Sequence, residues 1–338
     1  MSLPTLRSLP AKLVGAALNT LELPMRALQR ALGVPRIGWV FVTPNLIVLG
    51  LFTFLPIVID FHYAFTGGAQ LYPAERPYTG ADNLRTLFDC GSYLDPSSCR
   101  IDLFWRAAFN TAWFALLQVG LMVLMSLITA LVLNGRIFGR GFFRGVFFYP
   151  VLLSPVVVAL VWKWILQREG LLNALLHGAG IAGPVWLNDA SWAFFWSVFV
   201  SIWAHMGFYT LILLAGLQAI PADLYEAAEM DSASPWRRFY RITLPLLMPN
   251  LIVVIVLALI RAVQIFDEIF VLTGGGPGSA TLFIVQFIYQ TAFAESIRLY
   301  GLAAAASLVL AATLLILTLV QLRVSRQGMG DKARRDDG

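Results

Sequence analysis

Four polar residues gather late in a sequence that is otherwise mostly apolar: Arg261, Gln264, Asp267 and Glu268. Spacings of three and four residues predict that Arg261, Gln264 and Glu268 share one face of a helix. A guanidinium, an amide and a carboxylate on one face could hydrogen-bond the hydroxyl groups of a sugar. The same side chains could instead form an ion pair, from Arg261 to Glu268 or to another helix. The sequence favours neither interpretation over the other.

Other polar residues in apolar surroundings fit structural hydrogen bonds better than ligand contacts: Asn110, Gln118, His205 and Tyr209. Catalytic chemistry is not indicated, because the three histidines are far apart in the sequence and no nucleophile motif accompanies them. The phosphate-binding pattern G-x-x-x-x-G-K-[ST] does not occur. We therefore expect no catalytic residue, no metal site and no cofactor in this chain.

The composition predicts an integral membrane protein. Of 338 residues, 59% are hydrophobic and 13% are charged, and the mean hydropathy is +0.75. Soluble domains are about a quarter charged, so lipid must surround most of this chain. Six stretches without Asp, Glu, Lys or Arg approach the roughly 20 residues that a helical span needs. They cover residues 38–59, 107–133, 145–162, 190–222, 242–260 and 299–322.

These stretches show no strand-like alternation, so the expected fold class is all-α, with six transmembrane helices. The third and fifth stretches are short, and we expect their helices to extend past Lys163 and Arg261. The transmembrane domain is expected over residues 38–323, after an interfacial or cytoplasmic segment 1–37 and before a cytoplasmic tail 324–338. A seventh span within 1–37 is less favoured because Pro24 interrupts a short apolar run.

Lysine and arginine predict the orientation of the spans. One side carries 16 of these residues and the other 7, while Arg261 falls inside a span. The more basic side faces the cytoplasm in such proteins, so both termini are expected there. The net charge of +5 is then a topology signal rather than evidence of nucleic-acid binding. Residues 62–106 become an external loop, where an oxidising compartment would allow a disulfide between Cys90 and Cys99. Two free thiols are the alternative.

The predicted cytoplasmic loop 218–248 is long and structured. Pro221 and Asp223 begin a short helix, and small alanines at 227 and 228 leave a flat face on it. Ser234 followed by Pro235 predicts the start of a second short helix, which Leu244-Pro245 would close. Since connections are usually short, this pattern favours a docking element over an ordinary connector.

The run Glu226-Ala227-Ala228-Glu229-Met230-Asp231-Ser232-Ala233 resembles the EAA loop of permeases in binding-protein-dependent ABC importers. The segments Thr79 to Leu84, Gly170 to Asn173 and Phe266 to Phe293 resemble the carbohydrate-uptake branch of that family. The resemblance covers roughly residues 38–323. It implies a type I importer permease fold with a cytoplasmic coupling helix.

The resemblance also implies partners and roles. A second permease, two ATPase subunits carrying ATP and Mg, an external solute-binding protein and a sugar-like solute are expected, in the bacterial inner membrane. The ATPase-coupling residues would be Glu226, Ala227, Ala228, Asp231, Ser232 and Ala233. Phe266-Asp267 matches a feature of the family, which makes Asp267 a weaker ligand candidate than Arg261, Gln264 and Glu268. Asn110 and Tyr209 are further candidates for the solute path.

One residue departs from the family pattern, which has glycine where this chain has Ser232. A left-handed turn there would cost a non-glycine residue about 1–2 kcal/mol. Either the turn differs or docking offsets the cost.

Three other functions compete with this interpretation. A permease of the same fold could carry a polyol, glycerol phosphate or an anionic sugar. An ion-coupled secondary transporter would leave the Glu226 loop without a purpose, and no convincing internal repeat supports it. A membrane enzyme is not supported, because the sequence contains neither a cluster of metal ligands nor a nucleophile motif.

Overall fold

The computed structural model describes residues 29, 33–135, 137–294 and 298–336, and most of the expected segment 1–37 lies outside these ranges. The chain divides into two units, residues 1–62 and 63–338. In the first unit and its junction, α2 (Val34–Leu49), the π-helical turn η1 (Gly50–Phe54) and α3 (Leu55–Ala64) follow one another without a gap. Residues 37–64 form one apolar helix long enough to span a membrane.

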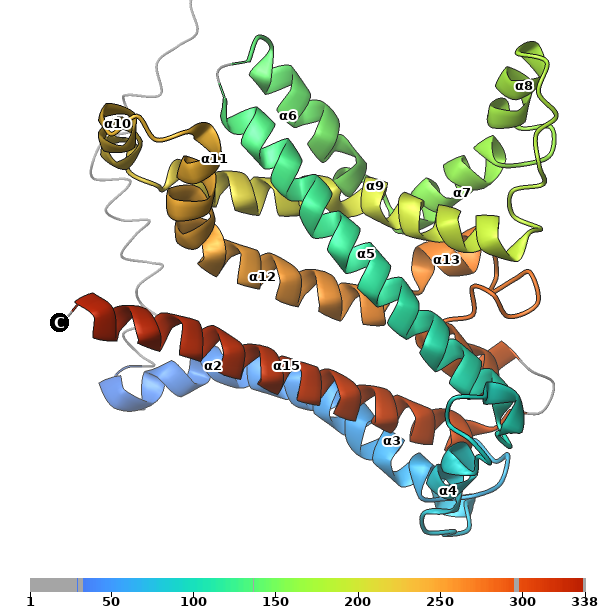
Figure 1. Cartoon of the computed structure of the whole chain (residues 1–338). Coiled ribbons are helices and arrows are strands. Elements are labelled where there is room, and N and C mark those ends of the chain that lie inside the picture. Colours follow the sequence, from blue (N-terminus) through green and yellow to red (C-terminus); the bar gives the residue numbers. More distant parts are fainter. Residues whose placement is uncertain (1–28, 30–32, 136, 295–297, 337–338) are drawn as a thin grey trace, which may run out of the picture. The chain divides into compact units, whose positions relative to one another are not determined.

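Four further helices of membrane length belong to the second unit (Figure 1). They are α5 (Asp102–Asn134), α9 (Ala190–Gln218), a helix over residues 235–263 and α15 (Tyr300–Asp336). The helix over 235–263 comprises α11 (Pro235–Arg238), the π-helical turn η5 (Phe239–Thr243) and α12 (Leu244–Val263). α5 packs along α9, and α12 packs against both. Met122, Leu213 and Leu247 are fully buried where these three helices meet.

The third expected span is not one helix. α6 (Arg140–Phe148) continues into η4 (Tyr149–Leu152), and α7 (Pro155–Ile165) follows at an angle of 100°. Ser154 is extended because a residue before proline is excluded from the helical region. The described residues therefore hold five helices of membrane length, and six spans if the bent pair counts as one. The expectation of an all-α membrane fold is confirmed, whereas that of an unbroken third helix is wrong.

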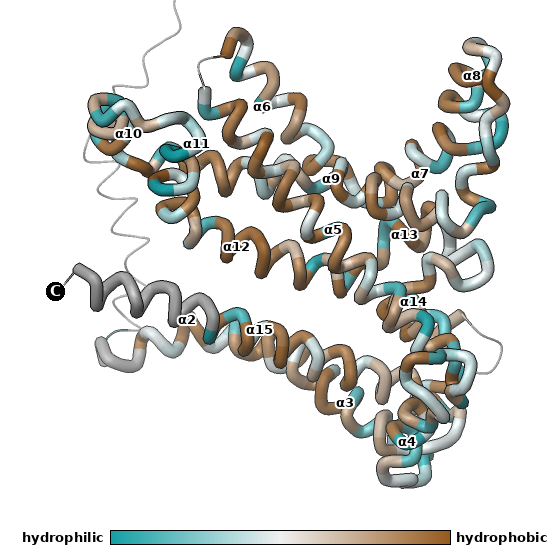
Figure 2. The backbone as a smooth tube through the Cα atoms, in the orientation of Figure 1, coloured by the Kyte–Doolittle hydropathy of each residue, from teal (hydrophilic) through white to brown (hydrophobic). Residues whose placement is uncertain are grey.

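Short elements occupy the connections. They are η2 (Pro73–Glu75), α4 (Asp82–Phe88), η3 (Pro96–Ser98), α8 (Leu171–Gly178), α10 (Ala222–Met230), α13 (Asp267–Leu272), α14 (Ile284–Tyr289) and η6 (Gln290–Ala294). Figure 2 shows hydrophobic residues along α5, α9 and α12, and hydrophilic ones gathered around α10, α11 and α4. Below, residues 66–101 are called the disulfide loop and residues 219–234 the α10 segment.

Candidate solute site and coupling segment

The polar group around Arg261 lies at a break between two helices. α12 ends at Val263, and α13 begins at Asp267 after Phe266, whose backbone is far from helical (φ −148°, ψ −65°). Arg261 and Gln264 are exposed, whereas only 4% of Glu268 is exposed. The prediction that Arg261, Gln264 and Glu268 share one continuous helical face is therefore wrong. Neither glycine nor proline marks the break, so residue spacing alone could not reveal it.

His205 on α9 stands between the two charges. Its Nδ1 lies 2.9 Å from the carbonyl oxygen of Ser201 and 3.7 Å from Oε1 of Glu268. A carbonyl can only accept, so Nδ1 carries the proton and Nε2 accepts from Nη2 of Arg261. Ser201 Oγ donates to Glu268 Oε1 at 3.1 Å. A neutral imidazole thus joins the guanidinium to the carboxylate.

This arrangement corrects the ion-pair alternative. Arg261 has no carboxylate within 4.0 Å among the described residues, and His205 occupies the place expected for a direct partner. Sequence reasoning gave His205 only a structural role. The available signal was its spacing of four from Ser201, which puts both on one face of α9.

A cavity of about 280 Å³ opens at the helix break. Arg261, Gln264, Asp267 and Glu268 line it together with apolar residues that include Leu257 and Ile260 of α12. Asp267 is exposed in the first turn of α13, where a negative charge suits the helix dipole. A guanidinium, an amide and a carboxylate around one space supply both donors and acceptors, as a polyhydroxylated solute requires.

Asn110 and Tyr209 do not line this cavity. Asn110 Nδ2 donates to the carbonyl oxygens of Ser279 at 2.7 Å and Leu282 at 3.1 Å, so it holds residues 279–282 against α5. Tyr209 is 3% exposed and packs in the core formed by α5, α9 and α12. Both residues were candidates for the solute path, and the structure gives both a place in the packing.

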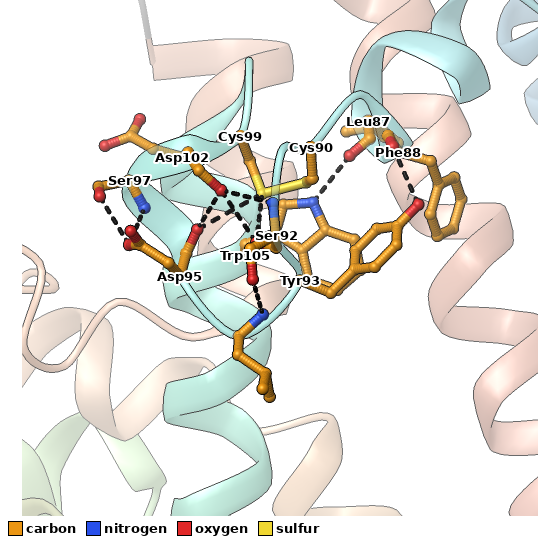
Figure 3. The surroundings of a disulfide bond; sticks show 12 residues. Leu87, Phe88, Cys90, Ser92, Tyr93, Asp95, Ser97, Cys99, Asp102 and Trp105 are labelled. Carbon is orange, nitrogen blue, oxygen red and sulfur yellow. Dashed lines mark hydrogen bonds between the residues drawn. A yellow bond between two sulfur atoms is a disulfide. The ribbon is translucent and has the colours of Figure 1, made fainter.

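Cys90 and Cys99 form a disulfide that closes a hairpin before α5 (Figure 3). The indole of Trp105, on α5, donates to the carbonyl oxygen of Leu87 at 2.8 Å, and the Tyr93 ring packs on Trp105 with centroids 5.2 Å apart. Inside the hairpin, Asp95 accepts from the hydroxyl and the amide of Ser97. These bonds lower the pKa of the Asp95 carboxyl.

The other end of the disulfide loop is anchored by Arg76, which is 6% exposed. Its guanidinium donates to Thr66 Oγ1 at 2.9 Å, to the Thr66 carbonyl at 3.1 Å and to the Gln70 carbonyl at 2.8 Å. Burial lowers the pKa of this guanidinium, opposed by the Tyr63 and Tyr300 hydroxyls. Nothing in the sequence around Arg76 indicated an anchor.

Asn83 and Gly301 complete the same anchor. Asn83 Nδ2 donates to the carbonyls of Ala64 at 2.9 Å and Thr66 at 3.1 Å. α15 approaches so closely at Gly301 that a Cβ there would lie 2.5 Å from the Thr66 carbonyl oxygen. Glycine is therefore required at this position for steric reasons.

The α10 segment has a different construction, because α10 contains no buried residue. Glu226, Ala227, Asp231 and Ser232 are exposed, and Ala228 and Ala233 are partly buried. The Ala233 amide donates to the Ala228 carbonyl at 2.9 Å and the Ser232 amide to Glu229 at 3.0 Å. This paired closure places Ser232 in the left-handed region, with φ of 53°. The turn is thus the one that glycine favours, formed here by serine.

Two contacts tie α10 to the helix that follows. The hydroxyls of Tyr225 and Thr243 lie 2.9 Å apart, and Arg238 Nη1 lies 3.5 Å from Glu229 Oε1. Ser234 accepts from the Arg237 amide at 3.3 Å, as its expected N-cap role requires. The expected closure at Leu244-Pro245 is wrong, because residues 235–263 continue as one helix through η5. Pro245 lies directly after the π-helical turn η5, inside this continuous helix.

Comparisons with known proteins agree with this architecture. Residues 101–327 match the family described as binding-protein-dependent transport system inner membrane component. The trehalose/maltose transport system permease protein MalF of Thermococcus litoralis is 37% identical over 294 residues, which cover 86% of this chain and 94% of that protein. The sulfoquinovosyl glycerol transport system permease protein SmoG of Agrobacterium fabrum is 32% identical over 306 residues, 90% of this chain and 95% of SmoG.

A solved structure has the same fold. A chain of a bacterial ABC transporter that imports the acidic polysaccharide alginate superposes with a TM-score of 0.74 at 24% identity, covering 89% of this chain and 99% of that one. Matches of this length and identity leave no room for an unrelated membrane fold. The chain belongs to the family of inner membrane components of binding-protein-dependent transport systems.

Proposed function

We propose that this chain is the permease subunit of an ATP-driven importer in a bacterial inner membrane, and that it forms half of the path for a sugar or sugar-like solute. The proposal rests on the exposure of α10, a helix without a buried residue, whose side chains are free to contact a partner subunit. A second permease, two ATPase subunits and an external solute-binding protein complete the assembly. Both termini and α10 face the cytoplasm. The ion-coupled transporter is set aside because the chain belongs to a different family.

ATP and Mg belong to the partner ATPase, and this chain acts without catalysis. The absence of a phosphate-binding loop from the sequence supports this division. The ATPase would seat α10 through Glu226 and Asp231, and Ala227 would permit close approach. Tyr225 and Glu229 would then pass its movement to the helix over residues 235–263 through Thr243 and Arg238.

Replacing Glu226 by arginine tests the coupling role. The full complex is purified by a tag on this chain and assayed for bound ATPase and for ATP hydrolysis stimulated by the solute-loaded binding protein. Glu226→Arg is expected to reduce both at least tenfold, since a buried interface charge pair is worth about 2 kcal/mol or more. The matched control is Glu169→Arg, which reverses an exposed charge in the connection before α8. Wild-type coupling in Glu226→Arg would refute the assignment.

The solute path is proposed to include the cavity at the break between α12 and α13. Gln264 and Asp267 supply the donors and acceptors that sugar hydroxyls need, and His205 fixes the guanidinium of Arg261 beside them. The relative that carries trehalose and maltose in its name supports a neutral sugar.

An anionic sugar is the second candidate, because Arg261 faces the cavity with no carboxylate within 4.0 Å among the described residues. The relative named for sulfoquinovosyl glycerol supports this alternative. Uptake of radiolabelled trehalose and of a sugar sulfonate by the reconstituted complex separates the two. Arg261→Gln should abolish uptake of an anion and reduce uptake of a neutral sugar only a fewfold. Equal transport of each solute by wild type and Arg261→Gln would exclude Arg261 from the path.

A further inference from the structure

Two arginines on α6 share a single acceptor. Arg140 and Arg144 lie one turn apart, and the side-chain oxygen of Gln218 accepts from Nη2 of both, at 2.8 and 2.7 Å, when its amide is turned to meet these donors. Each Nε is buried without a hydrogen-bond partner among the described residues. Neither guanidinium has a carboxylate within 4.0 Å in the same part of the chain. The two guanidinium groups therefore have too few hydrogen-bond acceptors and no carboxylate partner among the described residues.

The local helix ends do not supply that charge. Gln218 is the last residue of α9, whose C-terminal dipole offers about half an elementary charge against two full positive charges. The arginines also occupy the first turns of α6, where a cation is disfavoured. Gly139 gives that helix no side-chain cap, and no acidic residue lies in its first turn. An anion beside this end of α6 would neutralise the arginines and satisfy the helix terminus together.

Large apolar side chains stand next to the arginines. Phe138 is fully exposed and Phe142 is 72% exposed. Across the same helix, α6 lies against α9, where Gly207 admits the backbone of Phe147. α6 is thus an amphipathic helix fixed on one side, with phenylalanines directed outward near two unneutralised guanidiniums. That combination of a phosphate-binding fork and exposed apolar side chains suits a lipid better than a free ion.

We propose that Arg140 and Arg144 bind the phosphodiester of an anionic phospholipid, such as phosphatidylglycerol, whose acyl chains lie along Phe138 and Phe142. One negative charge would offset most of the roughly 1.5 positive charges that remain after the end of α9 is counted, since the neutral amide of Gln218 removes none. The fork geometry of arginine suits phosphate oxygens, which lysine would contact only as a point charge. The inference does not depend on the proposed solute or on ATPase coupling.

Native mass spectrometry of the full chain in neutral detergent tests the site. The protein is titrated with phosphatidylglycerol and, separately, with phosphatidylcholine. A retained phosphatidylglycerol adduct is expected at concentrations where phosphatidylcholine leaves none. Arg140→Gln/Arg144→Gln should weaken that adduct about 10- to 30-fold, because each basic residue near an anionic lipid contributes about 1 kcal/mol. The matched control, Arg85→Gln/Arg100→Gln, removes two charges from exposed positions of the disulfide loop and should bind as wild type does.

Two further measurements test the role of the arginine fork and the kind of anion that binds. Arg140→Lys/Arg144→Lys retains the charge and should bind phosphatidylglycerol more weakly than wild type. Inorganic phosphate is added to wild type as a competitor, and it should not displace the lipid. Displacement by phosphate would identify a free-anion site instead. Equal binding of the two lipids by wild type, or an undiminished adduct in Arg140→Gln/Arg144→Gln, would overturn the proposal and point to an acidic side chain of a partner subunit.

Discussion

The disulfide loop and the α10 segment both connect membrane-length helices, yet different forces hold them. In the disulfide loop, polar side chains hold the backbone: the buried Arg76 and the partly buried Asn83 together donate to three carbonyls, and a disulfide closes the hairpin. In the α10 segment the backbone closes the helix on itself, and no side chain of α10 is buried. The first loop is fixed to the body of the protein, whereas the second presents a preformed helix with little attachment.

The largest effect on the anchored loop is expected when α15 is pushed away from the disulfide loop. Gly301→Ala places a Cβ 2.5 Å from the Thr66 carbonyl and 2.7 Å from Asn83 Nδ2. Neither atom can yield without losing the anchor, so we expect a loss of about 3 kcal/mol or more, at the upper end for an overpacked site. Thermal unfolding in detergent measures it. Gly120→Ala is the matched control, because a Cβ at Gly120 meets nothing within 4 Å. Similar melting of both variants would show that the close approach is not needed.

Removing the anchoring guanidinium should have the next largest effect. Arg76→Gln deletes three donated hydrogen bonds and the contact with the Tyr63 ring, 4.7 Å from its centroid. We expect a loss of about 2–3 kcal/mol, since two hydrogen bonds to the buried Thr66 and one to Gln70 are lost together. The comparison variant is Arg85→Gln, whose side chain is 81% exposed and whose loss should be within about 0.5 kcal/mol. Limited proteolysis should cut the disulfide loop faster only in Arg76→Gln.

Introducing a glycine should stabilise the α10 segment, whereas replacing Gly301 should destabilise the anchor of the disulfide loop. Ser232→Gly relieves a side chain from the left-handed region and should stabilise the end of α10 by about 1 kcal/mol. Hydrogen exchange at the amides of Ser232 and Ala233 measures this directly, because both close the turn. Ser234→Ala, which removes the N-cap of the next helix, should instead increase exchange at the Arg237 amide. Faster exchange in Ser232→Gly would mean that the serine side chain contributes a contact.

The smallest expected effect is the response of the hairpin to acid. The pKa of Asp95 is lowered in the folded hairpin by the Ser97 hydroxyl and amide. Stabilisation by the carboxylate is therefore present above the unfolded pKa of about 3.9 and lost as the pH falls through the lower folded value. Protection of the Ser97 amide from exchange should decline on acidification below about pH 4. Asp95→Asn does not titrate at this position, so its protection should stay constant over the same range.

Sequence reasoning reached the α10 segment more completely than the solute site. The end of α10, the Ser234-Pro235 start and the question of a left-handed Ser232 all depend on local backbone rules, and local rules are visible in the sequence. Pro155 also indicates the bend after Ser154. The apolar stretch 145–162 nevertheless favoured a single helix, because it contains no charged residue.

The break between α12 and α13 had no such signal. It occurs at Ile265 and Phe266, which are ordinary helix residues, and it depends on Glu268 reaching Ser201 and His205 across the fold. Contacts over more than 60 residues of sequence cannot be inferred from periodicity within one helix. Gly301 was missed for the same reason, because Thr66 lies far from it in the sequence. Arg76 was missed because its partners Thr66 and Gln70 lie in an irregular loop, where spacing predicts no contact.

The continuous helix over residues 235–263, which includes η5 and Pro249, has a mechanical consequence. From Arg238, where α10 is attached, to Arg261 at the cavity, it extends about 35 Å. For a helix that moves as one unit, a tilt of about 10° near Arg238 displaces the cavity end by about 6 Å. Under the proposed function, a small rotation imposed by the ATPase would therefore move the wall of the cavity by a distance comparable to a hexose.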